Sequence, residues 1–420
     1  MDEATERTVP FDLLEAARER GIPARLIERA LELRVGLGPI RHWLSMDWMN
    51  AEFIERRLYW HEQLTFGSLR GREATRKDNE AFSELMANSP EEVGEWDIYT
   101  ERGPNAFAQF RLQENVTLLV LEEAGVLIAC CSFTTRKTIV SGMRITVRYG
   151  QALRVHKDYR RRGYGDQVRS LSWGVGAARP SHCQYDIMRP QNLAIVNWWT
   201  KYAPDFWENI PKKEGEVPGV RVTVHQYPGR PFDGDAAGIR KAREDDLERC
   251  VALINRTHDG LDLFRPYTTE YLRNRLDDGY WGEKMSWFDA DWPHVYGWED
   301  YYVLEERGRV VACAGLWDRG RDARDRYRHK ETGEEKVVSM TSALDFGFET
   351  GREAAMARLV AHLIGETHRL GRDFLAIPLE QLPSVAAQLE AYEPVPETRA
   401  LRWEPSDPPM VRPHIDLSYW

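Results

Sequence analysis

Hydrophobic and polar positions follow the same order twice along this chain. The segment VLEEAGVLIAC (120–130) consists of two apolar, strand-like runs around a Glu-Glu-x-Gly turn, and VLEERGRVVAC (303–313) repeats the pattern. Each predicts a β-hairpin whose glycine supplies a positive φ angle. Upstream, the segments that begin at Arg72 and Arg240 each predict a short strand followed by a helix capped near an aspartate. Two matches in the same order indicate a duplicated domain rather than a short solenoid repeat.

The repeat also divides the chain. Arg72, Ala74 and Asp78 of the first copy correspond to Arg240, Ala242 and Asp246 of the second. Proline, glycine and aspartate cluster between Tyr227 and Gly238, which predicts a boundary there. We therefore expect a helical N-terminal extension over 1–66, a first domain over 67–230 and a second domain over 236–420.

The N-terminal extension has helical periodicity. In IPARLIERALELRV, Pro23 falls at a first helical position, and apolar residues fall on one face: Leu26, Ile27, Ala30 and Leu33. The segment 51–64 continues the pattern with Phe53, Ile54, Leu58 and Leu64. This predicts helices that pack on the first domain; the alternative is a module for docking a partner or for dimerisation.

Composition narrows the class of protein. Of 420 residues, 42% are hydrophobic and 30% are charged, which is ordinary for a soluble globular protein. No apolar run reaches the roughly 18 residues that span a bilayer, and the acidic first twenty residues lack an apolar signal core. We expect a cytoplasmic protein with no membrane partner. The formal net charge of −10 argues against a nucleic-acid partner and is compatible with a cationic substrate.

Cysteine and histidine spacing predicts no metal site. The five cysteines are odd in number and show no CxxC pair, so we expect buried small side chains rather than disulfides or a zinc site. The eleven histidines show no HExxH spacing.

The segment RVHKDYRRRGYGDQVRSL (154–171) carries the clearest chemistry. It joins an apolar strand-like run to a helix-like run, where unpaired N–H groups and the helix dipole favour an anion. Gly163 and Gly165 permit a turn whose N–H groups form an anion-binding nest, and three arginines precede it. The Walker loop is absent, and Val168 stands where a dinucleotide fingerprint needs its third glycine. The segment therefore suits a pyrophosphate.

This segment resembles the acyl-CoA pyrophosphate loop of the GNAT acyltransferase superfamily, V-x-x-x-[YF]-R-x-x-G-x-G. The matching residues are Val155, Tyr159, Arg160, Gly163 and Gly165. The resemblance extends from about Arg72 to Tyr227, and to the second copy through the hairpin repeat.

A second stretch, NLAIVNWWTKYAPDF, resembles the superfamily pattern N-x-x-A-x-x-x-Y-x-K-x-G-F. Asn192 and Lys201 occupy its Asn and Lys positions, whereas Trp199 stands at the tyrosine. In the superfamily that tyrosine often protonates the departing CoA thiolate, which an indole cannot do. Either Tyr202 donates instead, or no acid is needed, because a thiol pKa of about 8.5 makes thiolate a tolerable leaving group.

The resemblance implies fold, cofactor and reaction. Each domain would be an α/β fold with a mixed, mostly antiparallel central sheet flanked by helices, two such folds in tandem. Acyl-CoA, most simply acetyl-CoA, would lie between the two central parallel strands, and a primary amine would attack its thioester directly in a ternary complex. The implied cofactor-binding residues are Leu153, Val155, Arg160, Arg161, Arg162, Gly163, Tyr164, Gly165, Asn192 and Trp199.

A general base is harder to assign. The amine must lose a proton before it attacks. Many family members carry a carboxylate on the strand before the loop, but RITVRYGQALRV (144–155) has none. Asp186, on the next predicted strand, and Tyr149 are the candidates. A strand aspartate that only pairs with a neighbouring arginine is an equally good interpretation of Asp186.

The second copy differs at the corresponding junction. Its sequence, ETGREAAM, keeps one glycine, Gly351, and replaces the arginine cluster with Glu349 and Glu353. This predicts a domain degenerate in CoA binding that covers the first domain's substrate face, supplies specificity residues or forms a dimer contact. The charged insertion from Asp318 to Lys336 predicts a solvated excursion; the alternative is a patch for an anionic partner.

These observations favour an acetyl-CoA-dependent N-acyltransferase acting on a small-molecule amine. Three alternatives remain open: a non-catalytic acyl-CoA-binding sensor, a protein lysine or N-terminal acetyltransferase whose helices dock the target, and a duplicated GNAT fold recruited to other chemistry. A homodimer is compatible with the sequence.

Overall fold

A computed structural model describes residues 10–33, 35, 37–45, 50–52, 54–55, 58–59, 62, 69–176, 181, 183–192, 220–278, 295–403 and 412–419. The N-terminal helices are α1 (Phe11–Glu19), α2 (Ala24–Glu32) and α3 (Leu37–Ser45). The first half contains β1 (Leu69–Glu73), α5 (Asn79–Ala87), β2 (Glu91–Val93), β3 (Trp96–Arg102), β4 (Thr117–Glu123), β5 (Val126–Val140), β6 (Met143–Val155), α6 (Tyr164–Gly176), β7 (Cys183–Met188) and β8 (Val220–Pro228). The second half contains β9 (Ile239–Lys241), α9 (Leu247–Thr257), α10 (Thr269–Asp278), β10 (Tyr301–Glu306), β11 (Arg309–Trp317), β12 (Ala323–His329), β13 (Glu335–Val338), β14 (Met340–Phe348), α11 (Glu353–Arg369), β15 (Phe374–Ile377), α12 (Pro383–Gln388) and β16 (Val395–Trp403).

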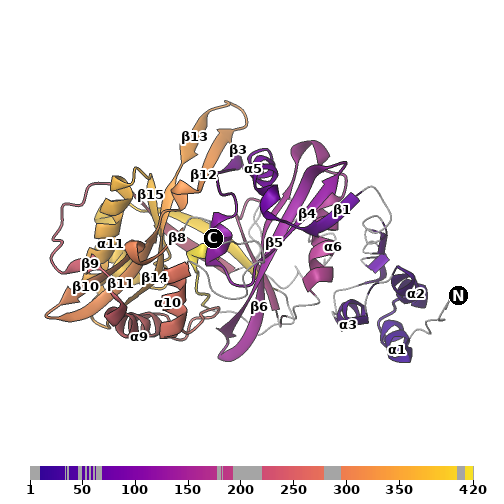
Figure 1. Ribbon diagram of the computed structural model, residues 1–420, viewed down its shortest axis with the longest axis horizontal. Coiled ribbons are helices and arrows are strands. Elements are labelled where there is room, and N and C mark those ends of the chain that lie inside the picture. The colour runs from indigo at the N-terminus through magenta and orange to yellow at the C-terminus, as the bar shows by residue number, and fades with distance from the viewer. Residues whose placement is uncertain are drawn as a thin grey trace.

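Among the described residues, twelve strands form one mixed sheet through the middle of the molecule (Figure 1). Their order is β1-β4-β5-β6-β7-β16-β8-β15-β14-β11-β10-β9, so the second half repeats the first in reverse. The parallel pairs in it are β6–β7 and β14–β15, and the other pairs are antiparallel. The predicted α/β fold, with a mixed and mostly antiparallel sheet flanked by helices, is confirmed.

The two predicted hairpins are present. β4 and β5 are joined at Ala124 (φ 50°) and Gly125 (φ 81°), and β10 and β11 at Arg307 (φ 54°) and Gly308 (φ 74°). Two successive positive φ angles are typical of the tight turn whose twist matches that of the flanking strands. The glycine of the Glu-Glu-x-Gly pattern is therefore explained by the positive φ angle that the turn requires at its position.

The repeated arginine and aspartate form the same contact in both halves. Arg72 donates from Nη1 and Nη2 to the two carboxylate oxygens of Asp78, each at 2.7 Å, and also pairs with Glu122 of β4. In the second half, Arg240 donates to Asp246 at 2.7 and 3.0 Å and pairs with Glu305 at 2.9 Å. Each arginine thus fastens the start of a helix to the edge of the sheet, which explains why the two copies share these residues.

The two halves exchange their last strands. β8, which follows the first half along the chain, pairs with β15 of the second half. β16, which ends the second half, pairs with β7 of the first, and β8 and β16 pair with each other in between. This exchange joins the two expected sheets into one. The proposed boundary near 227–238 therefore lies immediately after a strand that completes the other half's sheet.

The charged insertion is built into the fold rather than solvated throughout. β12 pairs antiparallel with β3 of the first half, from Ala323 opposite Arg102 to His329 opposite Trp96. Together with β2 and β13 these strands form a second, four-stranded sheet that bridges the halves (Figure 1). Residues 330–337 are exposed, as a solvated excursion predicts, whereas β12 departs from that prediction because β3 of the other half takes up its backbone hydrogen bonds.

The helices lie on both faces of the sheet. In the first half, Phe82 of α5 belongs to an apolar cluster on one face, and Val168 of α6 belongs to a separate cluster on the other. In the second half, Leu253 of α9 and Leu359 of α11 belong to two different clusters in the same way. Burial on both faces fixes the positions of β6 and β7 and of the loop that leads into α6.

The N-terminal helices pack mainly on one another. The four residues predicted on one face of α2 are buried, and they join apolar residues of α1 and α3 in a cluster of their own. Pro23 caps α2 one position before its first helical residue. Of the segment 51–64, Ile54 and Leu58 are buried, whereas Phe53 and Leu64 lie outside the described residues.

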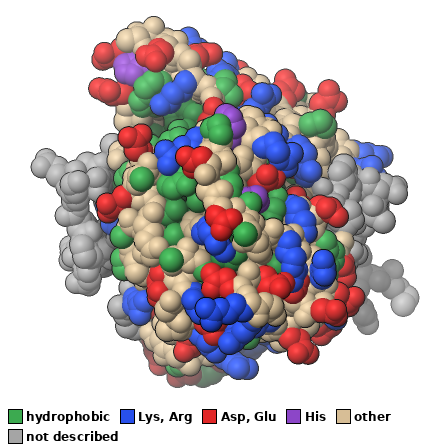
Figure 2. All heavy atoms as spheres, turned by 90° about the vertical axis from the view of Figure 1, so that its left-hand side faces the viewer, with side chains coloured by type: hydrophobic (Ala, Val, Ile, Leu, Met, Phe, Trp, Pro, Cys, Tyr) green, Lys and Arg blue, Asp and Glu red, His purple; other side chains and the backbone are tan. Residues whose placement is uncertain are grey.

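Other general expectations can be compared with the fold. All five cysteine side chains are buried, as the sequence predicts. Across the described ranges, no helix combines the length and the apolar character needed to cross a membrane. Figure 2 shows that acidic and basic side chains are interspersed on the face formed by the second half.

Candidate acyl-CoA site

The central feature of the first half is a wedge between its two parallel strands. β6 and β7 pair from Val147 opposite Cys183 to Gly150 opposite Asp186, and their pairing ends there. Beyond that point β6 pairs with no described strand other than β5, while β7 continues along β16. An irregularity in the β5–β6 register coincides with a positive φ angle of 51° at Ala152, and this bulge bends β6 away from β7.

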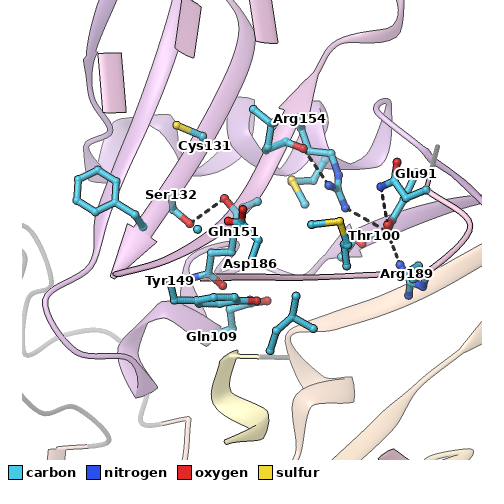
Figure 3. A pocket seen from close by; sticks show the side chains of 18 of the residues that line it. Glu91, Thr100, Gln109, Cys131, Ser132, Tyr149, Gln151, Arg154, Asp186 and Arg189 are labelled. Carbon is cyan, nitrogen blue, oxygen red and sulfur yellow. Dashed lines mark hydrogen bonds and ion pairs between the residues drawn. The ribbon is translucent and has the colours of Figure 1, made fainter. Parts of the chain in front are cut away.

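A cavity of about 160 Å³ occupies the wedge (Figure 3). Its lining includes consecutive residues 148–154 of β6 and 186–189 of β7 and the segment after it. Because no described strand pairs with β6 on this side, its backbone edge from Gln151 to Val155 faces the wedge. On this edge the Leu153 carbonyl accepts from Arg154 Nη1 at 3.0 Å, and the Val155 carbonyl accepts from Arg160 Nε at 3.4 Å. Leu153 and Val155, predicted to pair with a pantetheine arm, both lie on this edge.

The loop after β6 has the geometry of an anion nest. Arg161 and Gly163 have φ angles of 63° and 85°, and α6 begins at Tyr164. The N–H groups of Asp166 and Gln167 donate to the Gly163 carbonyl at 3.0 and 3.2 Å. Within the described part of the chain, the N–H groups of residues 163–165 have no hydrogen-bond acceptor. Three successive donors at a helix start therefore point to an anion at this position.

Several side chains of this loop already have partners. Arg160 donates to Glu92 Oε1 at 2.6 Å and to the Pro90 carbonyl at 2.5 Å. The Arg162 guanidinium lies 5.4 Å from the centre of the Tyr159 ring, and the Tyr164 hydroxyl donates to Glu123 at 3.2 Å. The backbone, with the exposed Arg161, is thus better placed than these three side chains to hold a diphosphate.

The two described catalytic candidates lie together at the base of the wedge (Figure 3). Asp186 is 9% exposed and lines the cavity, and its Oδ1 lies 2.3 Å from where a Cβ on Gly150 would be. Tyr149 is buried and stacks on Tyr185 with ring centres 5.0 Å apart. Burial raises the pKa of Tyr149 well above its usual range, so its phenol stays protonated at neutral pH. Tyr149 is therefore suited to donating a hydrogen bond and not to accepting a proton.

The remaining predicted residues divide into two groups. Asn192 lines the cavity, and its Nδ2 donates to Glu91 Oε1 at 2.9 Å. Trp199, Lys201 and Tyr202 lie outside the described residues, so their assignments stay predictions.

An ionic cluster that the sequence did not predict lies at the wide end of the wedge. Glu91 of β2 pairs with Arg189 and lies 3.8 Å from Arg154. Arg189 also lies 3.6 Å from Asp325 of β12 and 3.8 Å from Glu397 of β16. Burial alone would raise the pKa of Glu91, but Arg189, Arg154 and Arg399 outweigh it and lower that pKa to about 2. The carboxylate is therefore ionised and fixes the arginines that surround it.

The second half contributes directly to this cavity. Among its lining residues, Arg319 precedes β12, Asp325 lies on β12 and Arg399 on β16. These residues come from the charged insertion and the exchanged strand. The high charge density of the insertion indicated that it could bind a ligand. Its position at this cavity depends on the pairing of β12 with β3, which no local sequence pattern encodes. The expectation that the second half supplies residues to the first half's site agrees with this lining.

Positive charge predominates in the cavity. Among the described lining residues, three carboxylates stand against seven arginines: Glu91, Asp186 and Asp325 against Arg102, Arg148, Arg154, Arg169, Arg189, Arg319 and Arg399. Such a lining attracts an anionic ligand. It contrasts with the acidic balance of the whole chain.

The corresponding place in the second half is filled. Asp345 of β14 has a positive φ angle of 50°, as Ala152 has in β6, beside a similar register shift. Its carboxylate accepts hydrogen bonds from Tyr267 at 2.6 Å and from Arg275 at 2.8 Å. His258 bonds to the Phe346 carbonyl at 2.9 Å. The cavity here is about 10 Å³, room for about one water molecule.

The strand order, the wedge and the loop before α6 together define a class. This is a tandem GNAT-like fold, so the resemblance seen in the sequence is confirmed for the fold. Among solved structures, an N-myristoyltransferase from Saccharomyces cerevisiae with bound myristoyl-CoA is 13% identical, covers 81% of this chain and 83% of its own, and has a TM-score of 0.52. A second structure of that enzyme, with myristoyl-CoA and inhibitors, is 12% identical, covers 81% and 80%, and has a TM-score of 0.54.

A GCN5-related N-acetyltransferase from Sphaerobacter thermophilus is 13% identical and covers 84% of this chain and 98% of its own, with a TM-score of 0.44. No protein-family model matches the sequence, and no curated protein matches it. At these identities the similarity concerns the fold.

Proposed function

We propose that this protein is an acyl-CoA-dependent N-acyltransferase that transfers a short acyl group, acetyl in the simplest case, to a primary amine of a small molecule. One observation carries the proposal: the edge of β6 at 151–155, with which no described strand pairs, runs from the cavity toward an anion nest at the start of α6. A thioester with a long polar arm and a diphosphate at its far end fits that arrangement. The tandem GNAT-like fold supports it.

The residues divide the work by position. Backbone groups of Leu153 and Val155 would pair with the pantetheine arm, and N–H groups of residues 163–165 would hold the diphosphate. The coenzyme supplies the activated acyl group when bound. Attack by the amine nitrogen on the thioester carbonyl forms the amide bond, breaks the carbon–sulfur bond and releases CoA as its thiol.

We assign the base to Asp186. Its carboxylate lies at the point where the wedge opens, across Gly150, and lines the cavity that the amine would enter. It would take the proton that the amine loses, a contribution of about 100-fold to 10,000-fold in rate. Tyr149, protonated beside it, would donate a hydrogen bond to the reacting carbonyl or to the departing sulfur.

The size of the cavity favours a short acyl group. A space of about 160 Å³ is close to that of engineered cavities that hold a benzene molecule. It accommodates an acetyl group beside an amine more readily than a long fatty chain.

The second half would not bind acyl-CoA. The side chains of Tyr267 and Arg275 occupy the place that corresponds to the wedge, and the remaining cavity is too small for a pantetheine arm. Its role would be to complete the first half's sheet and cavity.

The test is turnover. The full-length protein is incubated with acetyl-CoA and a panel of small primary amines, and free thiol is measured with a thiol reagent. We expect thiol release that depends on one class of amine and falls at least tenfold in Asp186→Asn. Binding of acetyl-CoA without turnover on any amine would instead favour a non-catalytic sensor, and modification only of proteins would favour a protein acyltransferase.

A further inference from the structure

Two arginines from opposite halves line the cavity, and no carboxylate of the described residues forms an ion pair with either. Arg102 ends β3 in the first half, and Arg319 lies in the short turn before β12 in the second. The two segments are held together by the register of Ala323 opposite Arg102 and by a hydrogen bond of 2.7 Å from Gly103 N to the Asp322 carbonyl. The strand pairing between the halves therefore brings both guanidinium groups to one cavity.

The direct contacts of Arg102 are with neutral groups. Its Nη1 donates to the Ala106 carbonyl at 3.1 Å, and its guanidinium carbon lies 5.6 and 5.5 Å from the ring centres of Phe82 and Phe110. Its Nε is buried without a hydrogen-bond partner. Arg319 makes a contact of 3.8 Å with the sulfur of Met340. Within the described ranges, no carboxylate lies within 4 Å of either guanidinium.

A neighbouring arginine of the same cavity, by contrast, has its charge balanced by carboxylates. Arg189 is paired with Glu91 and lies within 4 Å of Asp325 and Glu397. Burial, together with the charges of Arg319 and Arg154, lowers the pKa of Arg102 to about 10 and outweighs the opposing charge of Asp325. A buried pair of like charges is costly unless a counter-charge arrives, and a bound anion supplies one with charge-assisted hydrogen bonds.

The diphosphate of the coenzyme does not account for this pair. None of the described residues of the loop 160–165 lines the cavity, whereas the β6 edge 151–154 does. The arginines therefore lie at the reacting end of the site and not at its phosphate end. An anion held there belongs to one of the two groups that react.

We propose that Arg102 and Arg319 form a subsite for a carboxylate of the reacting substrates. This inference rests on the proposed acyl transfer and names its substrate class. The carboxylate has two chemical sources: an amino acid as acceptor, with its amine toward Asp186, or a dicarboxylic acyl group on the coenzyme. A guanidinium group can bind either carboxylate in a bidentate manner.

Two matched pairs of probes distinguish the sources. The acceptor pair is an ω-amino acid and its amide, tested as glycine, β-alanine and γ-aminobutyrate against glycinamide, β-alaninamide and γ-aminobutyramide. The donor pair is succinyl-CoA and acetyl-CoA. Binding to the full-length protein is measured by thermal shift and calorimetry, and turnover by thiol release. The binding measurements test the preference for a carboxylate even where no turnover occurs.

We expect the carboxylate member of one pair to bind roughly 10-fold to 100-fold more tightly than its neutral counterpart. In Arg102→Gln and in Arg319→Gln this preference should fall below about threefold, while affinity for acetyl-CoA stays as in the wild type. Arg324→Gln is the control, because Arg324 is exposed on the same strand, β12, and does not line the cavity. Arg319→Gln keeps the test decisive if Arg102→Gln does not fold.

A wild-type protein with no preference in either pair would overturn the inference. So would a preference that survives in both variants. Failure of the proposed function has a different signature, namely no binding of acetyl-CoA or succinyl-CoA to the wild type at all.

Discussion

Asp186 lies against the one residue of β6 that has no side chain, Gly150. These two residues form the last pair of the β6–β7 register, and a Cβ at position 150 would lie 2.3 Å from Asp186 Oδ1. Glycine therefore allows the carboxylate to lie across the strand at the base of the wedge. The position of the proposed base depends on this missing side chain.

Substituting Gly150→Ala should displace the carboxylate. We expect kcat to fall by about 10-fold or more, because the base would no longer face the cavity, while the Kd for acetyl-CoA changes less than about threefold. Steady-state kinetics and calorimetry measure the two effects. Wild-type kcat in both Gly150→Ala and Asp186→Asn would show that Asp186 is not the base.

The loop before α6 makes a prediction about backbone geometry. Gly163→Ala should weaken acetyl-CoA binding, because a Cβ at a φ angle of 85° strains the nest and moves its N–H groups. Gly125→Ala is the matched control, since Gly125 has a φ angle of 81° in a hairpin turn with nothing nearby for a Cβ to meet. Both variants should lose about 1 kcal/mol of stability, and only Gly163→Ala should lose affinity. Equal affinities in the two variants would contradict a diphosphate site at this loop.

Glu91 predicts a dependence of stability on pH. Its pKa is about 2 in the folded protein, compared with 4.5 for a glutamate in the unfolded chain. Ionisation of Glu91 therefore stabilises the fold above pH 4.5, and this stabilisation disappears as the pH falls toward 2. The difference between these pKa values corresponds to about 3 kcal/mol. Urea unfolding should show Glu91→Gln to be less stable than the wild type at pH 7, with the gap closing between pH 4.5 and 2.

The neighbouring residue provides the control for that experiment. Glu92 also pairs with an arginine, Arg160, but its side chain is 58% exposed. Glu92→Gln should cost less than about 1 kcal/mol at pH 7. If Glu91→Gln behaved like Glu92→Gln at every pH, the ionic cluster would not stabilise the site.

The exchanged strands predict cooperative unfolding of the two halves. Because β8 completes the second half and β16 the first, neither half keeps its sheet when the other unfolds. We expect one urea transition, with coincident curves from circular dichroism and tryptophan fluorescence. Two separate transitions would show that the halves are stable without each other's strand.

The sequence predicted features that are local and missed those that depend on distant partners. The hairpin at Gly125 and the loop at Gly163 could be predicted because their positive φ angles select glycine. The contact of Arg72 with Asp78 could be recognised as part of the sequence repeat, because its two residues are only six positions apart. The pairing of β12 with β3 joins residues more than 200 positions apart, so the contribution of Arg319 and Asp325 to the cavity could not be predicted.

The side chains of the arginine cluster show the same limit within one motif. The sequence indicated an anion site at residues 160–165, and the backbone geometry agrees with it. It could not show that Arg160 is bound to Glu92, because Glu92 comes from a different strand.

The most direct measurement is calorimetric titration of the full-length protein with acetyl-CoA, alongside Gly163→Ala. The account predicts one binding site per chain, with an affinity that Gly163→Ala weakens. No heat of binding at high concentration, or two equivalent sites per chain, would contradict the proposal that the first half alone holds the coenzyme.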